Sequence, residues 1–322
     1  MPVMTLLDGI RAASRDVCGQ ARHVHLDQGR ISAYAASLPI DRASGAELDP
    51  RYHFLGSPVQ TVAFILTLDA INFGSGYFPH LRKLPGLSGY FTVASHLTER
   101  FRARGPFTAG QLAALSGKDC TALFRQEPDS APVSELMELF AKALNQLGRY
   151  LTDNFGGEFE GLVEAAGGSA ERLVELLAAM EYLRDVERYG DREIPFFKRA
   201  QLTAADLSLA LRGEGWGRFT DLQRLTIFAD NLVPHVLRVD GILAYERELS
   251  ERIDAGQLIP AGSEEEVEIR AGAVHAVELL VQQLHGRNQK IRALDLDYLL
   301  WNRGQGSFYK ARPRHRTQTV FY

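Results

Sequence analysis

Residues 132–155 read PVSELMELFAKALNQLGRYLTDNF, and this stretch decides the fold class. It is long and amphipathic, and Gly156 and Gly157 follow it as a signal that ends a helix. Apolar residues recur at helical spacing elsewhere too. In residues 5–20, for example, one helix face would carry Leu6, Leu7, Ile10, Ala13 and Val17. We therefore predict a mainly helical protein.

Helical patterns fill most of the remaining chain. Pro58 opens a strongly apolar run over residues 59–68, whose length fits a buried helix better than a strand. Ser169 caps one predicted helix, and Ser263 with Glu266 forms the capping box of another. Further helices are expected over residues 87–101, 108–115, 119–124, 170–183, 198–211, 220–225, 233–240, 243–253, 264–284 and 294–302.

Three regions interrupt the helical pattern. Residues 188–197 predict a small hairpin or extended segment, because Gly, Asp and Pro punctuate their apolar side chains. Residues 41–56 indicate a surface loop, and residues 303–322 indicate a basic, irregular tail. No repeat, low-complexity tract or long linker divides the chain, so we predict one helical domain over residues 1–322 with a few short strands.

Composition narrows the function. The chain is 45% hydrophobic and 24% charged, which is typical of a globular protein in water, and it has no apolar run long enough to span a membrane. A net charge of −4 argues against a protein whose main function is to bind a nucleic-acid polymer, but it is compatible with binding one small phosphorylated ligand. Two cysteines, Cys18 and Cys120, are too few for a disulfide framework, and residues 1–10 lack a signal-peptide pattern. We expect a cytoplasmic protein.

An acid inside an apolar run carries the strongest functional prediction. Asp230 lies two residues after Phe228 and four before Pro234, and proline is well tolerated in the first turn of a helix. Asp230 is therefore expected just ahead of a helix that begins near Val233. It either caps that helix or acts as a catalytic carboxylate beside a ring that can stack on a flat substrate.

Two further acids stand beside aromatic residues. Asp297 and Trp301 are four residues apart, so they share one face of the last predicted helix. Asp69 ends the most apolar helix, next to Phe73. For each acid the alternative is a solvated or capping side chain.

A basic pair follows two aromatic residues in the middle of the chain. If a helix begins at Lys198, its backbone N–H groups together with Lys198 and Arg199 form a natural seat for a phosphate. The alternative is a helix start exposed to solvent. His53, just ahead of the apolar helix, is either a packed histidine or a ligand-binding one.

Several common motifs are missing from this sequence. It contains no glycine-rich phosphate loop, no metal-binding pair of histidines or cysteines, and no serine-hydrolase elbow. Residues 84–89 only loosely match the turn of a DNA-binding helix-hairpin-helix.

The chain resembles the queuosine salvage protein family, the queuosine 5′-phosphate N-glycosylase/hydrolases. The resemblance covers almost the whole chain, because seven short segments match in order. They lie at residues 14–17, 68–73, 197–201, 228–230, 266–270, 296–298 and 315–322.

The resemblance implies a helical fold similar to DNA glycosylases and hydrolysis of queuosine 5′-monophosphate to release queuine, a 7-deazaguanine base. It implies that Asp230 is the catalytic carboxylate and Phe228 the stacking ring. Asp297, Trp301 and Asn302 would line the base site with His53 nearby, and Lys198 with Arg199 would hold the phosphate.

The chain departs from the family pattern at three positions. Asn231 and Leu232 replace an aromatic and a basic residue that often follow the aspartate, and Asn302 replaces an acid. A contact made by that acid would be weaker or different here.

The implied chemistry suits these residues. A carboxylate can stabilise the sugar cation or activate water, with no metal or organic cofactor. An ionised Asp297 can accept two N–H groups from the base. We expect a small-molecule substrate and a monomer, with no nucleic-acid polymer and no membrane as partner. The alternatives are a DNA or RNA base glycosylase and a non-catalytic protein that binds a modified base.

Overall fold

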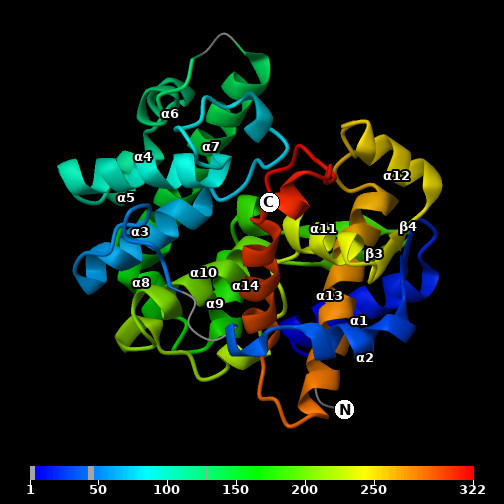
Figure 1. Ribbon diagram of the computed structural model, residues 1–322. Coiled ribbons are helices and arrows are strands. Elements are labelled where there is room, and N and C mark those ends of the chain that lie inside the picture. The colour runs from blue at the N-terminus through cyan, green and yellow to red at the C-terminus, as the bar shows by residue number, and fades with distance from the viewer. Residues whose placement is uncertain (1–3, 43–46, 128–129) are drawn as a thin grey trace. The chain divides into compact units, whose positions relative to one another are not determined.

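The computed structural model describes residues 4–42, 47–127 and 130–322, and it is mainly helical with a few short strands, as predicted (Figure 1). The chain divides into two compact units. The first comprises residues 1–46, 185–198 and 223–318, and the second comprises residues 47–184, 199–222 and 319–322. This division does not test the prediction of one domain over residues 1–322, which stays a prediction.

The second unit is built around α7 (Ala131–Phe155), the helix that the opening stretch predicts. Gly156 ends α7 in a left-handed conformation with a φ of 63°, which confirms the predicted stop. Gly148 lets α5 approach closely, because a Cβ atom there would lie 2.3 Å from the backbone oxygen of Ala109. The other α-helices of this unit are α3 (Pro58–Ala70), α4 (Gly89–Arg104), α5 (Ala109–Ala113), α6 (Gly117–Leu123), α8 (Phe159–Glu164), α9 (Ala170–Leu177) and α10 (Lys198–Ala210), whose first residue belongs to the first unit.

The first unit is built around α13 (Glu264–His285), which packs against α1 (Leu6–Gln20), α2 (Gln28–Ser37), α11 (Leu232–Val239) and α14 (Ala293–Gly304). Ser263 caps α13, as predicted, by accepting a hydrogen bond from the backbone of Glu266. The remaining helices are α12 (Arg247–Asp254) and α15 (Ser307–Lys310).

Two small antiparallel pairs complete the first unit. β2 (Val186–Tyr189) pairs with β3 (Arg192–Pro195), which confirms the predicted hairpin. β1 (Val24–Leu26) pairs with β4 (Leu243–Tyr245). The predicted helix over residues 243–253 is therefore wrong in its first part, because β4 pairs with β1 and the helix begins only at Arg247.

Other predicted boundaries change in the structure. The helix expected over residues 170–183 ends at Leu177, and a 3-10 turn, Glu181–Leu183, follows. Residues 220–225 form only the 3-10 turn Leu222–Arg224. The sequence patterns missed α2 and α8, and α15 interrupts the tail expected to be irregular. Part of the loop predicted over residues 41–56 lies outside the described residues.

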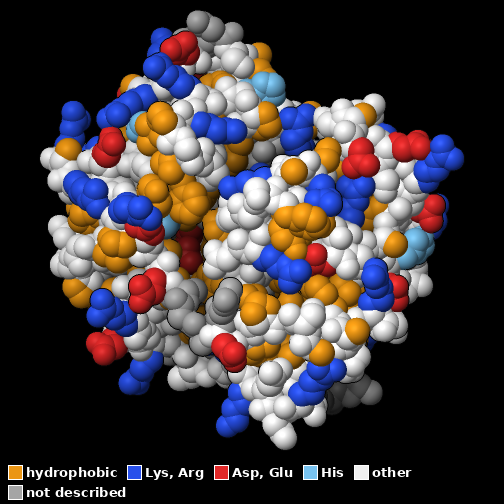
Figure 2. Space-filling view, viewed as in Figure 1, with side chains coloured by type: hydrophobic (Ala, Val, Ile, Leu, Met, Phe, Trp, Pro, Cys, Tyr) orange, Lys and Arg blue, Asp and Glu red, His pale blue; other side chains and the backbone are white. Residues whose placement is uncertain are grey.

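The surface carries both signs of charge. On the face shown in Figure 2, Lys and Arg side chains are interspersed with Asp and Glu side chains and with hydrophobic ones. Within the described ranges, the longest helices are too short or too polar to cross a membrane.

Candidate active site

Asp230 lies where the sequence predicts it, in the entry to α11. Its Oδ1 atom accepts hydrogen bonds from the backbone N–H groups of Leu232 at 2.7 Å and Val233 at 3.3 Å. Asp230 therefore bonds the first two N–H groups of α11, although the N-cap position itself is occupied by Asn231. The side chain is half-buried, whereas Phe228 and Ala229 before it are buried. The cap holds one carboxylate oxygen in a fixed place at the edge of the core.

Asp297 on α14 is the second carboxylate of this region. It is 3% exposed, and its Oδ1 atom accepts the backbone N–H of Phe228 at 2.9 Å. Burial raises the pKa of Asp297 well above its usual range, and the negative charge of Asp230 raises it further. The Phe228 N–H and the charge of Lys198 act in the opposite direction but do not cancel the rise.

The raised pKa changes the expectation for Asp297. Burial makes the ionised form of Asp297, which is the acceptor that the sequence predicts, more costly than for an exposed aspartate. The charge coupling also shows that Asp230, Asp297 and Lys198 belong to one electrostatic group within the first unit. Two carboxyl groups that are coupled by charge, one of them buried, are a common basis for acid–base chemistry.

The aromatic residues of the site are packed to different degrees. Phe228 is buried, and its ring meets that of Tyr298 edge to face, with centroids 6.3 Å apart. Trp301 is half-buried on α14, and Asn302 is exposed. The roles predicted for Phe228, Trp301 and Asn302 toward a base stay predictions.

Lys198 begins α10 and is buried. Its backbone N–H donates to Oδ2 of Asp185 at 3.0 Å. One N–H of the predicted phosphate seat is therefore already bonded to a carboxylate of the protein. The ammonium group remains electrostatically coupled to Asp297.

Arg199, the next residue, belongs to the second unit and is almost wholly buried. Its guanidinium donates to the backbone oxygens of Asp69 and Ala70, at 3.1 and 2.5 Å, and to those of Tyr182 and Val320. It also lies 4.8 Å from the ring centre of Phe73. These contacts give Arg199 a structural role, and its predicted phosphate contact stays a prediction.

His53 also belongs to the second unit, where it is a packed histidine. Nδ1 lies 3.0 Å from the backbone oxygen of Asp49, and Nε2 lies 2.9 Å from the hydroxyl of Tyr90. Burial lowers the pKa of His53, which favours the neutral ring. Its predicted contact with a base stays a prediction.

Comparison with known proteins identifies the family. The family model described as "Queuosine salvage protein" matches residues 52–322. The chain belongs to the queuosine salvage protein family. The resemblance seen in the seven short segments is thereby confirmed.

Relatives with one shared name match most of the length of this chain. A Sphaerobacter thermophilus protein named "Queuosine 5'-phosphate N-glycosylase/hydrolase" is 34% identical over 319 residues, covering 98% of both chains. Proteins with the same name from Dictyostelium discoideum and Mus musculus are 33% and 30% identical. The first covers 81% of this chain and 78% of the relative, and the second covers 97% and 98%.

The sequence analysis missed a buried ion pair in this queuosine salvage protein, one residue of which bonds to Lys198 and the other to Ala229. No sequence pattern led to a prediction for Asp185, and Arg270 was included only in the family segment 266–270. In the structure the two residues form a buried ion pair at 2.5 Å. Arg270 did carry a signal, because a cation stands among Ile269, Ala271 and other apolar residues of a helix. Within residues 4–42, 47–127 and 130–322, there is no group of three or more His, Cys, Asp or Glu placed to hold a metal ion.

Proposed function

We propose that this chain hydrolyses the N-glycosidic bond of queuosine 5′-phosphate and releases queuine, with Asp230 as its catalytic carboxylate. The observation that carries the proposal is the match to a protein of that name at 34% identity over 98% of both chains. The charge coupling of Asp230 to a buried second carboxyl supports the choice of residue.

The reaction breaks the bond between the ribose carbon and the base nitrogen. The bonding electrons leave with the base, which gains a proton, and the sugar passes through a state with oxocarbenium character before water adds to it. We assign Asp230 Oδ1 to the cap of α11 and Oδ2 to the sugar or the attacking water. A carboxylate held by two backbone N–H groups is already oriented when charge develops on the sugar.

The base would be held beside this carboxylate. We propose that Asp297 accepts N–H groups of the 7-deazaguanine, that Phe228 and Trp301 contact its flat face, and that Asn302 completes the contacts. Because burial raises the pKa of Asp297, the N–H groups of the base would have to offset the cost of keeping an ionised acceptor there. Base stacking on an aromatic ring contributes on the order of 1–3 kcal/mol.

The 5′-phosphate would be held by Lys198, whose charge already acts on the carboxylate pair. We further propose a fold similar to the helical DNA glycosylases, a monomer, and a cytoplasmic location. A single nucleotide as substrate is compatible with a net charge of −4 and with the mixed charges of Figure 2, neither of which favours a nucleic-acid polymer.

Incubating the protein with queuosine 5′-monophosphate and following free queuine by chromatography tests the proposal. Catalytic release of queuine is expected. Tight queuine binding with no release would instead identify a binding protein. Retention of DNA or RNA in a gel-shift assay at physiological salt, with base excision from the polymer, would identify a nucleic-acid glycosylase.

A further inference from the structure

Arg270 stands at the centre of a buried polar cluster in the first unit. Its side chain is 0% exposed, and its two terminal nitrogens donate to both oxygens of Asp185, at 2.9 and 2.5 Å. The guanidinium carbon lies 4.0 Å from the ring centre of Phe196. A guanidinium that is stacked and bound at two points in this way has little freedom to move.

The third nitrogen of the same side chain reaches the loop that carries Asp230. Nε donates to the backbone oxygen of Ala229 at 2.9 Å. Ala229 is the residue immediately before Asp230, so this bond sets the backbone from which the carboxylate projects.

Asp185 connects Arg270 to the residue proposed to hold the phosphate. Its Oδ2 atom accepts the backbone N–H of Lys198 at 3.0 Å, and its backbone oxygen accepts the N–H groups of Phe196 and Phe197, at 2.9 and 3.1 Å. One aspartate therefore takes up three consecutive N–H groups ahead of α10.

Phe197 shows why such support is needed. Its φ is 47°, in the left-handed region that residues other than glycine rarely adopt. A backbone of this kind persists only where surrounding contacts hold it. The hydrogen bonds that Asp185 accepts from Phe196, Phe197 and Lys198 supply that support.

We propose that Arg270 is a positioning residue for the reaction. Through its bonds to Ala229 and Asp185, it fixes the positions of Asp230 and Lys198 relative to each other. This inference rests on the proposed function. Arg270 reaches Asp230 and Lys198 only through the backbones of the loops that carry them, so we infer no direct contact with substrate.

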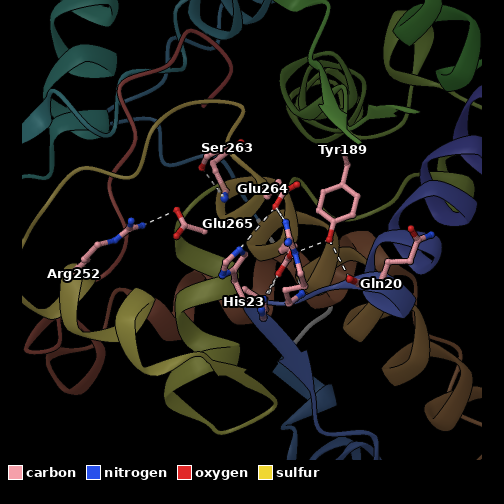
Figure 3. A network of polar contacts seen from close by, with 11 residues as sticks. Gln20, His23, Tyr189, Arg252, Ser263, Glu264 and Glu265 are labelled. Carbon is pink, nitrogen blue, oxygen red and sulfur yellow. Dashed lines mark hydrogen bonds and ion pairs between the residues drawn. The ribbon is translucent and has the colours of Figure 1, made fainter. Parts of the chain in front are cut away.

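Glu268, two residues earlier on α13, offers a matched control. It is buried and accepts backbone N–H groups from Arg22 at 3.0 Å, His23 at 2.6 Å and Val24 at 2.9 Å. The hydroxyl of Tyr189 also donates to it at 2.8 Å, and Figure 3 shows the same hydroxyl bonded to the backbone oxygen of Gln20. Glu268 therefore supports the same helix through a network that bonds to neither Ala229 nor Lys198.

The test compares Arg270→Lys with Glu268→Gln on queuosine 5′-monophosphate, well below the melting temperature of both variants. Lysine keeps the charge but cannot bind both Asp185 oxygens and Ala229 together. We expect Arg270→Lys to lower kcat at least about tenfold. Glu268→Gln should lower the melting temperature while kcat stays within about twofold of the parent value.

A double-mutant cycle with Asp230→Asn separates positioning from general support. If Arg270 acts by placing Asp230, Arg270→Lys should cause little further loss of kcat once the Asp230 carboxylate is gone. Should Arg270→Lys fail to fold, Asp185→Asn replaces it, because it keeps the backbone oxygen and the side-chain volume while removing the ion pair.

Three results would overturn the inference. They are a normal kcat in folded Arg270→Lys, an equal loss of kcat in Glu268→Gln, and an undiminished effect of Arg270→Lys in the Asp230→Asn background. Any of these with an active parent protein would leave the proposed function intact. A parent protein that releases no queuine would overturn the proposed function and this inference together.

Discussion

Replacing Asp230 by asparagine separates the two roles that the structure gives this side chain. The Oδ1 atom that accepts the N–H groups of Leu232 and Val233 has an equivalent in the amide of asparagine. Asparagine and aspartate are about equally good at helix starts, so we expect Asp230→Asn to change the free energy of unfolding by less than about 1 kcal/mol. The negative charge and the basicity of the second oxygen are lost.

The expected effect on turnover is much larger than the effect on stability. Loss of one well-placed acid–base or electrostatic group lowers kcat by at least about a hundredfold, or about 2.7 kcal/mol in the barrier. The charge of Asp230 also raises the pKa of Asp297, so Asp230→Asn should lower that pKa toward its usual range. This second effect gives a readout that does not depend on catalysis.

The assay combines queuine release, thermal unfolding and the pH dependence of queuine binding. Asp230→Ala is the matched control, because it removes both the charge and the cap and should cost about 1 kcal/mol of stability. We expect both variants to lose the same turnover and only the alanine variant to lose stability. Near-normal turnover in Asp230→Asn would remove Asp230 from the mechanism.

The other predictions concern charges in the same unit. Lys198→Ala should raise KM for queuosine 5′-monophosphate more than for the nucleoside, and equal effects on both substrates would reject a phosphate contact. Because the pKa of Asp297 is raised, queuine affinity should fall as the pH is lowered through that pKa, and calorimetry on Asp297→Asn should give a flatter profile. Burial, and then the charge of Glu266, raise the pKa of Glu187 to about 7 from 4.5. The folded state then binds this proton more tightly than the unfolded chain, so stability is lost as pH rises from about 4.5 through about 7. Above that pH range, the free energy of unfolding of Glu187→Gln should exceed that of the parent by about 1–3 kcal/mol, and below it the two should be equal. A difference that does not depend on pH would contradict a raised pKa at Glu187.

Local sequence patterns were sufficient to predict much of the fold and the position of Asp230. The amphipathic run of α7 with Gly156 behind it, the Ser263 cap of α13 and the hairpin of β2 and β3 are each encoded within a few neighbouring residues. The position of Asp230 ahead of α11 has the same basis, because Pro234 marks the first turn of that helix. Such features depend on backbone preferences and short-range hydrogen bonds.

Neighbouring residues could not reveal which polar groups meet across the fold. Residues 243–245 continue a helical pattern but form β4, because Val24–Leu26 from far along the chain pairs with them. Lys198 and Arg199 look equivalent in sequence, yet Arg199 binds four backbone oxygens while Lys198 acts on Asp297.

The sequence alone determined the helical class, the family and the acid expected to do the chemistry. Only the tertiary structure decided that burial raises the pKa of Asp297 and that Arg270 joins the loops of Asp230 and Lys198. The physical reason is that helix periodicity and capping act over a few residues. Desolvation, charge coupling and buried hydrogen bonds instead depend on which distant parts of the chain come together.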